Sequence, residues 1–114
     1  MRLVIIKNGT VGVSGQFIEG LDLSQCGLPE NFWALQWEEH TANSGHIEYD
    51  SPLIDNSLIT ELPAWVNACI VVWQAEIDRQ AALQAQRIQE EIDRQAAEAA
   101  AKAAAAAQQT QEGG

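Results

Sequence analysis

The chain has 114 residues, with 16 acidic and six basic side chains and a formal net charge of −10 at pH 7. Phosphates and anionic lipid headgroups repel so negative a chain, so we expect no direct binding to nucleic acid or to a membrane surface. The sequence has no apolar run long enough for a transmembrane span, and its first apolar stretch, residues 3–6, is too short for a signal-peptide core. These features predict a protein that is made and used in a cytoplasm.

The N-terminal half predicts a small antiparallel sheet. A short β-branched segment, residues 3–7, meets Asn8-Gly9 before a second apolar segment. Asn-Gly is typical of a two-residue hairpin with a type I′ turn, in which both central residues have positive φ. Residues 32–37 predict another strand, which pairs across a polar loop with residues 45–49. We therefore expect a head of three to five strands over residues 1–62.

The junction between the sheet and a long helix is predicted around residue 60. Residues 55–57 predict a short turn or a first helical turn. The hydroxyl of Thr60 can accept from a free amide of the first helical turn, and Pro63 tolerates that turn because its missing N–H costs little there. Residues 64–73 are apolar almost all round, as expected if the sheet covers one side of the helix and a second subunit the other.

One uninterrupted helix is predicted over residues 63–108, followed by a disordered tail at residues 109–114. Its apolar residues recur with an eleven-residue step, as in Val66, Ile77, Ile88 and Ala99. Such a helix would extend roughly 65–70 Å at about 1.5 Å per residue, far beyond what a small head could cover. A step of eleven residues, about 3.67 per turn, predicts a straight or weakly right-handed helical bundle or coiled coil. The predicted fold class is α+β, with the helix used for oligomerisation or partner binding.

The apolar side of this helix is the predicted oligomer or partner interface. Its members are Trp65, Val66, Ile70, Trp73, Ile77, Ala81, Ile88 and Ile92. Trp33 and Trp37 are four residues apart, share one face of the predicted strand and form a candidate contact of the head. Two interpretations of the four tryptophans stay open: a core that joins sheet to helix, or exposed side chains that anchor a partner. We expect a homo-oligomer, either a trimer or a dimer.

Catalytic and cofactor-binding patterns are missing from the sequence. The one group that could hold a metal has a spacing that matches no ligand set and is typical of a solvated loop. Its members are Glu38, Glu39, His40, His46 and Glu48. No Ser/His/Asp or Cys/His arrangement and no glycine-rich phosphate loop can be assigned. Cys26 and Cys69 lack a C-x-x-C spacing and predict buried, reduced thiols. We expect no enzyme, no metal and no cofactor.

Several segments of residues 3–50 resemble the head of small proteins that are encoded beside tail-fibre genes in tailed bacteriophages. The segments are Val4-Ile5-Ile6 with Gly9 and Val11, residues 20–24, Leu28-Pro29, residues 34–37 and residues 45–49. Members of that group combine a short β-rich head with a helical tail and are regarded as tail-fibre assembly chaperones or minor tail components. The resemblance includes no catalytic residue. It implies a phage tail-fibre or receptor-binding protein as the partner.

Two functions follow from the resemblance, and both stay open at this point. In the first, the protein is a non-enzymatic chaperone in the host bacterial cytoplasm, which holds a fibre polypeptide through its long helix and tryptophan-rich junction during assembly. In the second, it is a permanent minor structural component of a phage tail or baseplate and stays in the virion tail. A more distant alternative is an acidic inhibitor of a host protein.

Overall fold

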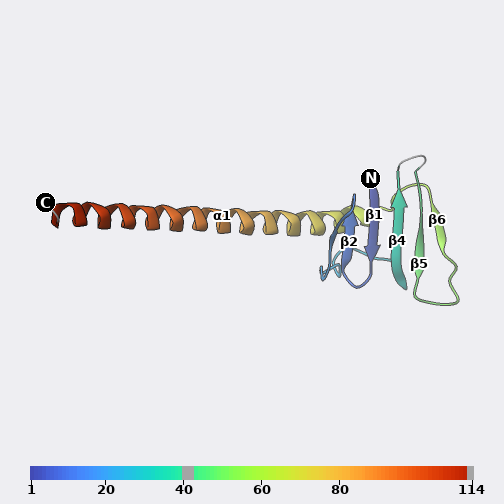
Figure 1. Ribbon diagram of the computed structural model, residues 1–114. Coiled ribbons are helices and arrows are strands. Elements are labelled where there is room, and N and C mark those ends of the chain that lie inside the picture. Colours follow the sequence, from blue (N-terminus) through green and yellow to red (C-terminus); the bar gives the residue numbers. More distant parts are fainter. Residues whose placement is uncertain (40–42, 113–114) are drawn as a thin grey trace. The chain divides into compact units, whose positions relative to one another are not determined.

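The computed structural model describes residues 1–39 and 43–112. Within these residues, six antiparallel strands form one sheet and one helix follows them (Figure 1), which confirms the predicted α+β class. The elements are β1 (Arg2–Ile6), β2 (Thr10–Val13), β3 (Gln16–Ile18), β4 (Phe32–Glu38), β5 (Ser44–Tyr49), β6 (Ser57–Ile59) and α1 (Trp65–Glu112). Across the sheet the strand order is β3-β2-β1-β4-β5-β6, so the two shortest strands form its edges.

The first hairpin turns through three residues instead of the predicted two. Ile6 pairs with Thr10, and the amide of Gly9 donates a 3.0 Å hydrogen bond to the carbonyl of Ile6. Gly9 has φ 100°, whereas Asn8 is not among the residues with positive φ, so the predicted type I′ turn is wrong. The side-chain oxygen of Asn8 instead accepts from the amide of Thr10 at 3.1 Å. A three-residue loop that ends in a left-handed glycine is a common alternative in hairpins.

Both edge strands lie outside the strands predicted from the sequence. β3 follows a tight turn at Ser14-Gly15, where φ values of 51° and 86° match the conformation expected of a type I′ turn. β6 begins at Ser57, the last residue of the turn or helical turn predicted at residues 55–57, and pairs with β5. Each of these strands has three residues, too few for an alternating pattern to be recognised.

A β-bulge in β4 decides which aromatic residue enters the core. Phe32 pairs with Tyr49 and Ala34 pairs with Glu48, which leaves Trp33 as an extra residue in β4. The bulge shifts the alternation by one, so that Phe32 rather than Trp33 points inward with Trp37. Trp33 is 46% exposed and Trp37 is buried, so the prediction that these two tryptophans share a face is wrong.

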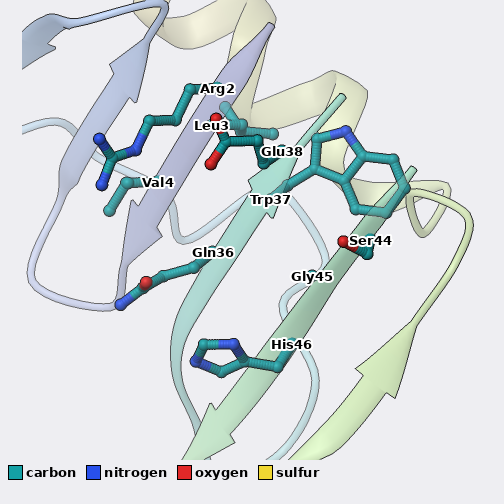
Figure 2. A pocket seen from close by; sticks show the side chains of 9 residues that line it. All are labelled: Arg2, Leu3, Val4, Gln36, Trp37, Glu38, Ser44, Gly45 and His46. Atoms are coloured by element: carbon teal, nitrogen blue, oxygen red, sulfur yellow. The ribbon is translucent and has the colours of Figure 1, made fainter. Parts of the chain in front are cut away.

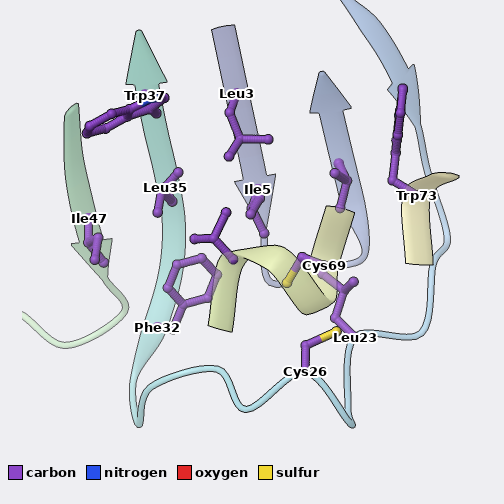
Figure 3. Packing of buried hydrophobic residues seen from close by; sticks show 12 residues of the cluster. Leu3, Ile5, Leu23, Cys26, Phe32, Leu35, Trp37, Ile47, Cys69 and Trp73 are labelled. Carbon is purple, nitrogen blue, oxygen red and sulfur yellow. The ribbon is translucent and has the colours of Figure 1, made fainter. Parts of the chain in front are cut away.

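The core lies between one face of the sheet and the first turns of α1 (Figure 3). α1 begins at Trp65, two residues after the predicted start, and Thr60 is therefore not its N-cap. The amide of Val66 donates to the carbonyl of Pro63 at 3.1 Å and closes the turn that leads into the helix. The buried apolar cluster consists of Leu3, Ile5, Val11, Leu23, Cys26, Phe32, Leu35, Trp37, Ile47, Val66, Cys69 and Trp73.

The chain forms two compact units, Met1–Asp78 and Arg79–Gly114. The first, called the head unit below, is longer than the predicted head of residues 1–62 because the start of α1 supplies part of its core. The second unit is helical through Glu112, beyond the predicted helix end at residue 108. Every side chain described in it, through residue 108, is exposed. The last residues of the predicted disordered tail, 113–114, lie outside the described residues.

Candidate interaction surfaces

The start of α1 places two of the predicted interface residues inside the head unit. Val66 is 1% exposed and Trp73 is 7% exposed, so neither is available to a partner while the head is folded. The indole N–H of Trp73 donates a 3.0 Å hydrogen bond to the carbonyl of Gln16, which satisfies the one polar atom of this side chain. Burial of these two residues favours the core interpretation of the predicted stripe over the partner interpretation at this end of the helix.

Trp65 is also engaged within the head unit. Its ring packs edge-on against Phe32 from β4, with ring centroids 5.1 Å apart and an interplanar angle of 71°. Ile70 and Ile77 are partly buried and pack against the same core cluster. Edge-to-face contacts of this kind stabilise a fold beyond the area that they bury. The first part of the predicted interface therefore joins the sheet to the helix.

The remaining predicted interface residues lie in the helical unit, Arg79–Gly114, and are exposed. Ile88 and Ile92 are each 53% exposed, and Ala81 is exposed as well. They belong to a longer series that recurs every three or four residues and so stays on one side of a helix. We call this series the helix face; it consists of Ala81, Ala85, Ile88, Ile92, Ala96, Ala99 and Ala103. Leu83, at 38% exposure, lies on the opposite side of the helix at about 100° per residue.

Polar side chains pair along the rest of the helical unit. Gln86 donates to Glu90 at 3.2 Å and Gln89 donates to Asp93 at 2.9 Å, both four residues apart. Arg94 forms an ion pair with Glu91 one turn before it. Pairs of this kind support an isolated helix by a few tenths of a kcal/mol each. None of these paired side chains belongs to the helix face.

The head unit also exposes several large apolar side chains, which lie at separate places on the sheet and its connections. They include Phe17, Trp33, Leu53 and Leu58. Phe17 and Leu58 belong to the edge strands β3 and β6, and Trp33 is the bulge residue of β4. Leu58 is 88% exposed. Sequence reasoning had selected Trp33 but missed Phe17 and Leu58, because the short strands that carry them were not predicted.

One small hollow on the head unit lies over β1, β4 and β5 (Figure 2). Its volume is about 170 Å³, below the range of roughly 300–1,000 Å³ that is usual for small-molecule sites. Arg2, Gln36, Glu38 and His46 contribute polar groups to its lining. The Nε2 atom of His46 lies 3.0 Å from Glu48 Oε1, so that carboxylate already engages the imidazole.

Metal-ligating groups do not gather in the part of the chain that the structure describes. No group of three or more His, Cys, Asp or Glu side chains there could hold a metal ion. His40, a member of the candidate metal group in the sequence, lies outside the described residues. Cys26 and Cys69 are both buried free thiols, as predicted. Burial and a hydrogen bond with Cys26 raise the pKa of the Cys69 thiol to about 12, which keeps it protonated and unreactive at neutral pH.

Among residues 1–39 and 43–112, no helix combines the length and the apolar character that a membrane span requires.

Comparisons of this chain with protein-family models, with curated proteins and with solved structures gave no match.

Proposed function

We propose that the protein is a non-enzymatic assembly factor that binds a phage tail-fibre or receptor-binding polypeptide in the host bacterial cytoplasm. One observation carries the proposal: the helical unit exposes an apolar helix face, although the head unit has a core of its own. An amphipathic helix with an open apolar face is a common docking element for another polypeptide. The phage client comes from the resemblance of residues 3–50 to tail-fibre-associated proteins.

Self-association is part of this proposal. Ile88 and Ile92 each keep about half of their surface in water when the chain is alone. Burial of such side chains is worth roughly 1.5–3 kcal/mol each before the cost of ordering is subtracted. Two or three copies of the helical unit can cover one another's helix face, and a client helix can replace one of the copies. A dimer or trimer is therefore the proposed resting form.

The head unit supplies a second contact for the client. With Trp65 and Trp73 engaged in the core, Trp33 becomes the tryptophan best placed to anchor a partner. Tryptophan is enriched among the residues that dominate binding energy at interfaces. The acidic character of residues 1–62, with nine acidic and two basic side chains, keeps such a complex in solution by repulsion between copies.

Co-expression with the neighbouring fibre gene tests the proposal. The double variant Ile88→Asp/Ile92→Asp places two charges on the helix face and should reduce both self-association and the yield of soluble fibre. The matched control, Leu83→Asp, places a charge on the opposite side of the same helix and should leave both unchanged. Equal soluble fibre with and without the protein would exclude the chaperone function.

A permanent structural role in the tail is the second candidate. The small residues of the helix face, Ala96, Ala99 and Ala103, favour this alternative because they allow helices to approach closely in a lasting bundle. Mass spectrometry of purified particles separates the two functions. Presence of the protein at a fixed ratio to the fibre supports a structural component, whereas its absence from particles despite abundant expression supports a chaperone.

A further inference from the structure

The helix face has the same spacing when it is read from either end. Its members, from Ala81 to Ala103, follow one another at steps of four, three, four, four, three and four residues, so the series is symmetric about Ile92. Two antiparallel helices related by a two-fold axis must each present a face that fits its own reversed copy. The helix face meets this condition when the axis passes at Ile92.

The two halves of the helix face also lie at matching angles around the helix. At about 100° per residue, Ala85 and Ala99 lie about 20° to either side of Ile92. The same count places Ile88 and Ala96 about 40° to either side. In an antiparallel pair centred on Ile92, Ala85 is level with Ala99 of the second copy, and Ile88 is level with Ala96 of the second copy. Each large side chain then packs beside a small one.

Small side chains favour two helices over three. Alanines make up five of the seven members of the helix face, and they let two helix axes approach closely. In a bundle of three, the faces of all three helices meet around a central space, which methyl groups do not fill to the density of a protein interior. The helix face therefore fits one partner helix better than two.

The net charge of the chain lies almost entirely in the head unit. Residues 1–78 hold eleven acidic and two basic side chains, a net −9, whereas residues 79–114 hold five acidic and four basic side chains, a net −1. A parallel pair would bring together the two copies of Asp78, at which the head units end. In an antiparallel pair centred on Ile92, they lie about 42 Å apart along the helices at about 1.5 Å per residue. Because the Debye length is roughly 8 Å at physiological ionic strength, repulsion between the heads disfavours the parallel pair and is screened in the antiparallel pair.

We propose that the helical units of two copies form an antiparallel pair whose two-fold axis passes at Ile92. This inference rests on the self-association in the proposed function and specifies the number of chains and their direction. A second copy of this chain then covers Ile88 and Ile92 in the resting protein and holds the two acidic heads at opposite ends. A client helix reaches the helix face by displacing one copy.

Engineered cysteines on the helix face test the direction of the pair in the full-length chain. The double variant Ala85→Cys/Ala99→Cys is oxidised in a glutathione buffer and digested with trypsin without reduction. Trypsin places the two positions in separate peptides, residues 80–87 and 95–102, and leaves both native cysteines in residues 8–79. We expect links between the unlike peptides in about tenfold excess over links between like peptides, because like positions lie about 21 Å apart in the antiparallel pair, beyond the reach of a disulfide.

The matched control is Leu83→Cys/Ala101→Cys. It places cysteines in the same two tryptic peptides and at the same symmetry about Ile92, but on the opposite side of the helix. This variant should form at most about a tenth of the links that the Ala85→Cys/Ala99→Cys variant forms, because its cysteines point away from the second copy. Equal linking in the two variants would overturn the proposal.

Light scattering of the unmutated chain checks the number of chains and should give the mass of two. Links between like peptides, or the mass of three chains, would overturn the antiparallel pair and leave the proposed function standing. The mass of one chain at tens of micromolar would overturn the pair together with the proposed self-association. Equal soluble fibre with and without the protein in the co-expression test would instead exclude the chaperone function and leave the pair intact.

Discussion

Two stretches of α1 are stabilised by different interactions. Residues 65–78 of α1 pack on the sheet and place Val66, Cys69 and Trp73 in its core. Residues 79–108 belong to the second unit, and each of their side chains is exposed. Both stretches are helical, yet the first is stabilised mainly by burial and the second by the intrinsic propensity of alanine-rich sequence and by pairs one turn apart. Helical continuity therefore does not imply uniform stability.

Truncation should give the largest difference between the two stretches in their effect on folding. A chain that ends after Asp78 keeps the whole core and should show a cooperative unfolding transition and near-ultraviolet circular dichroism like those of the full chain. A chain that ends after Leu62 lacks three buried side chains, each worth roughly 1.5–3 kcal/mol, and should not fold. Such a loss is comparable with the total stability of a small domain, about 5–15 kcal/mol.

If the chain that ends after Leu62 kept the near-ultraviolet spectrum of the full chain, the sheet would be stable alone. The start of α1 would then not be needed for the head, and the boundary predicted from the sequence, between residues 62 and 63, would describe the folding unit better than the boundary after Asp78.

Single replacements of Trp73 and Trp33 by alanine should lower the stability of the head unit by different amounts. Trp73→Ala removes a buried ring and the hydrogen bond to the Gln16 carbonyl, so the free energy of unfolding should fall by about 3–5 kcal/mol. Trp33→Ala removes a half-exposed ring and should cost about 1 kcal/mol or less. Urea titrations followed by circular dichroism measure both values. Equal losses would contradict the assignment of Trp33 to the surface.

The sequence predicted the parts of this fold that have strong periodicity. The apolar residues of α1 recur over many turns, and the longer strands carry β-branched and aromatic runs, so the fold class could be predicted. β3 and β6 could not, because three residues contain too little pattern and their pairing depends on neighbours distant in the sequence. Phe17 and Leu58, which these strands expose, were missed for the same reason.

The burial of individual aromatic residues was harder to predict than the strands themselves. Strand alternation places Trp33 and Trp37 on one face, but the bulge in β4 inserts one residue between them and gives the inner position to Phe32. Nothing in the local sequence marks the bulge. The interface stripe on α1 has a similar ambiguity, because spacing alone cannot tell whether the sheet or another chain covers Val66 and Trp73.

The Cys69 thiol should make the stability of the head fall as the pH rises in the alkaline range. An unfolded cysteine has a pKa of about 8.5, whereas burial and the hydrogen bond with Cys26 raise the pKa of folded Cys69 to about 12. Above the unfolded value, the unfolded chain releases a proton that the folded chain retains. The contribution of this thiol is therefore complete below about pH 8.5 and is lost progressively as the pH rises towards 12.

Urea unfolding of reduced protein between about pH 8 and pH 10.5 measures this effect. The variant Cys69→Ala serves as the control, because it keeps the other groups that titrate in this range. Its stability should fall less steeply with pH than that of the unmutated chain. Identical slopes would show that the thiol has the same proton affinity in the folded and unfolded chains.

The smallest expected effect comes from the same alanine-to-glycine substitution made once in each of the two stretches of α1. Ala68 packs against the core, whereas Ala100 is exposed in the helical unit and lies outside the helix face. Glycine costs about 1 kcal/mol relative to alanine in a helix. Ala68→Gly should therefore lower the global stability of the head by at least that amount. Ala100→Gly should accelerate amide hydrogen exchange about fivefold near residue 100 and leave the head unchanged, because the helical unit opens locally. If Ala100→Gly lowered the unfolding midpoint of the head as much as Ala68→Gly, the two stretches would unfold as one cooperative unit.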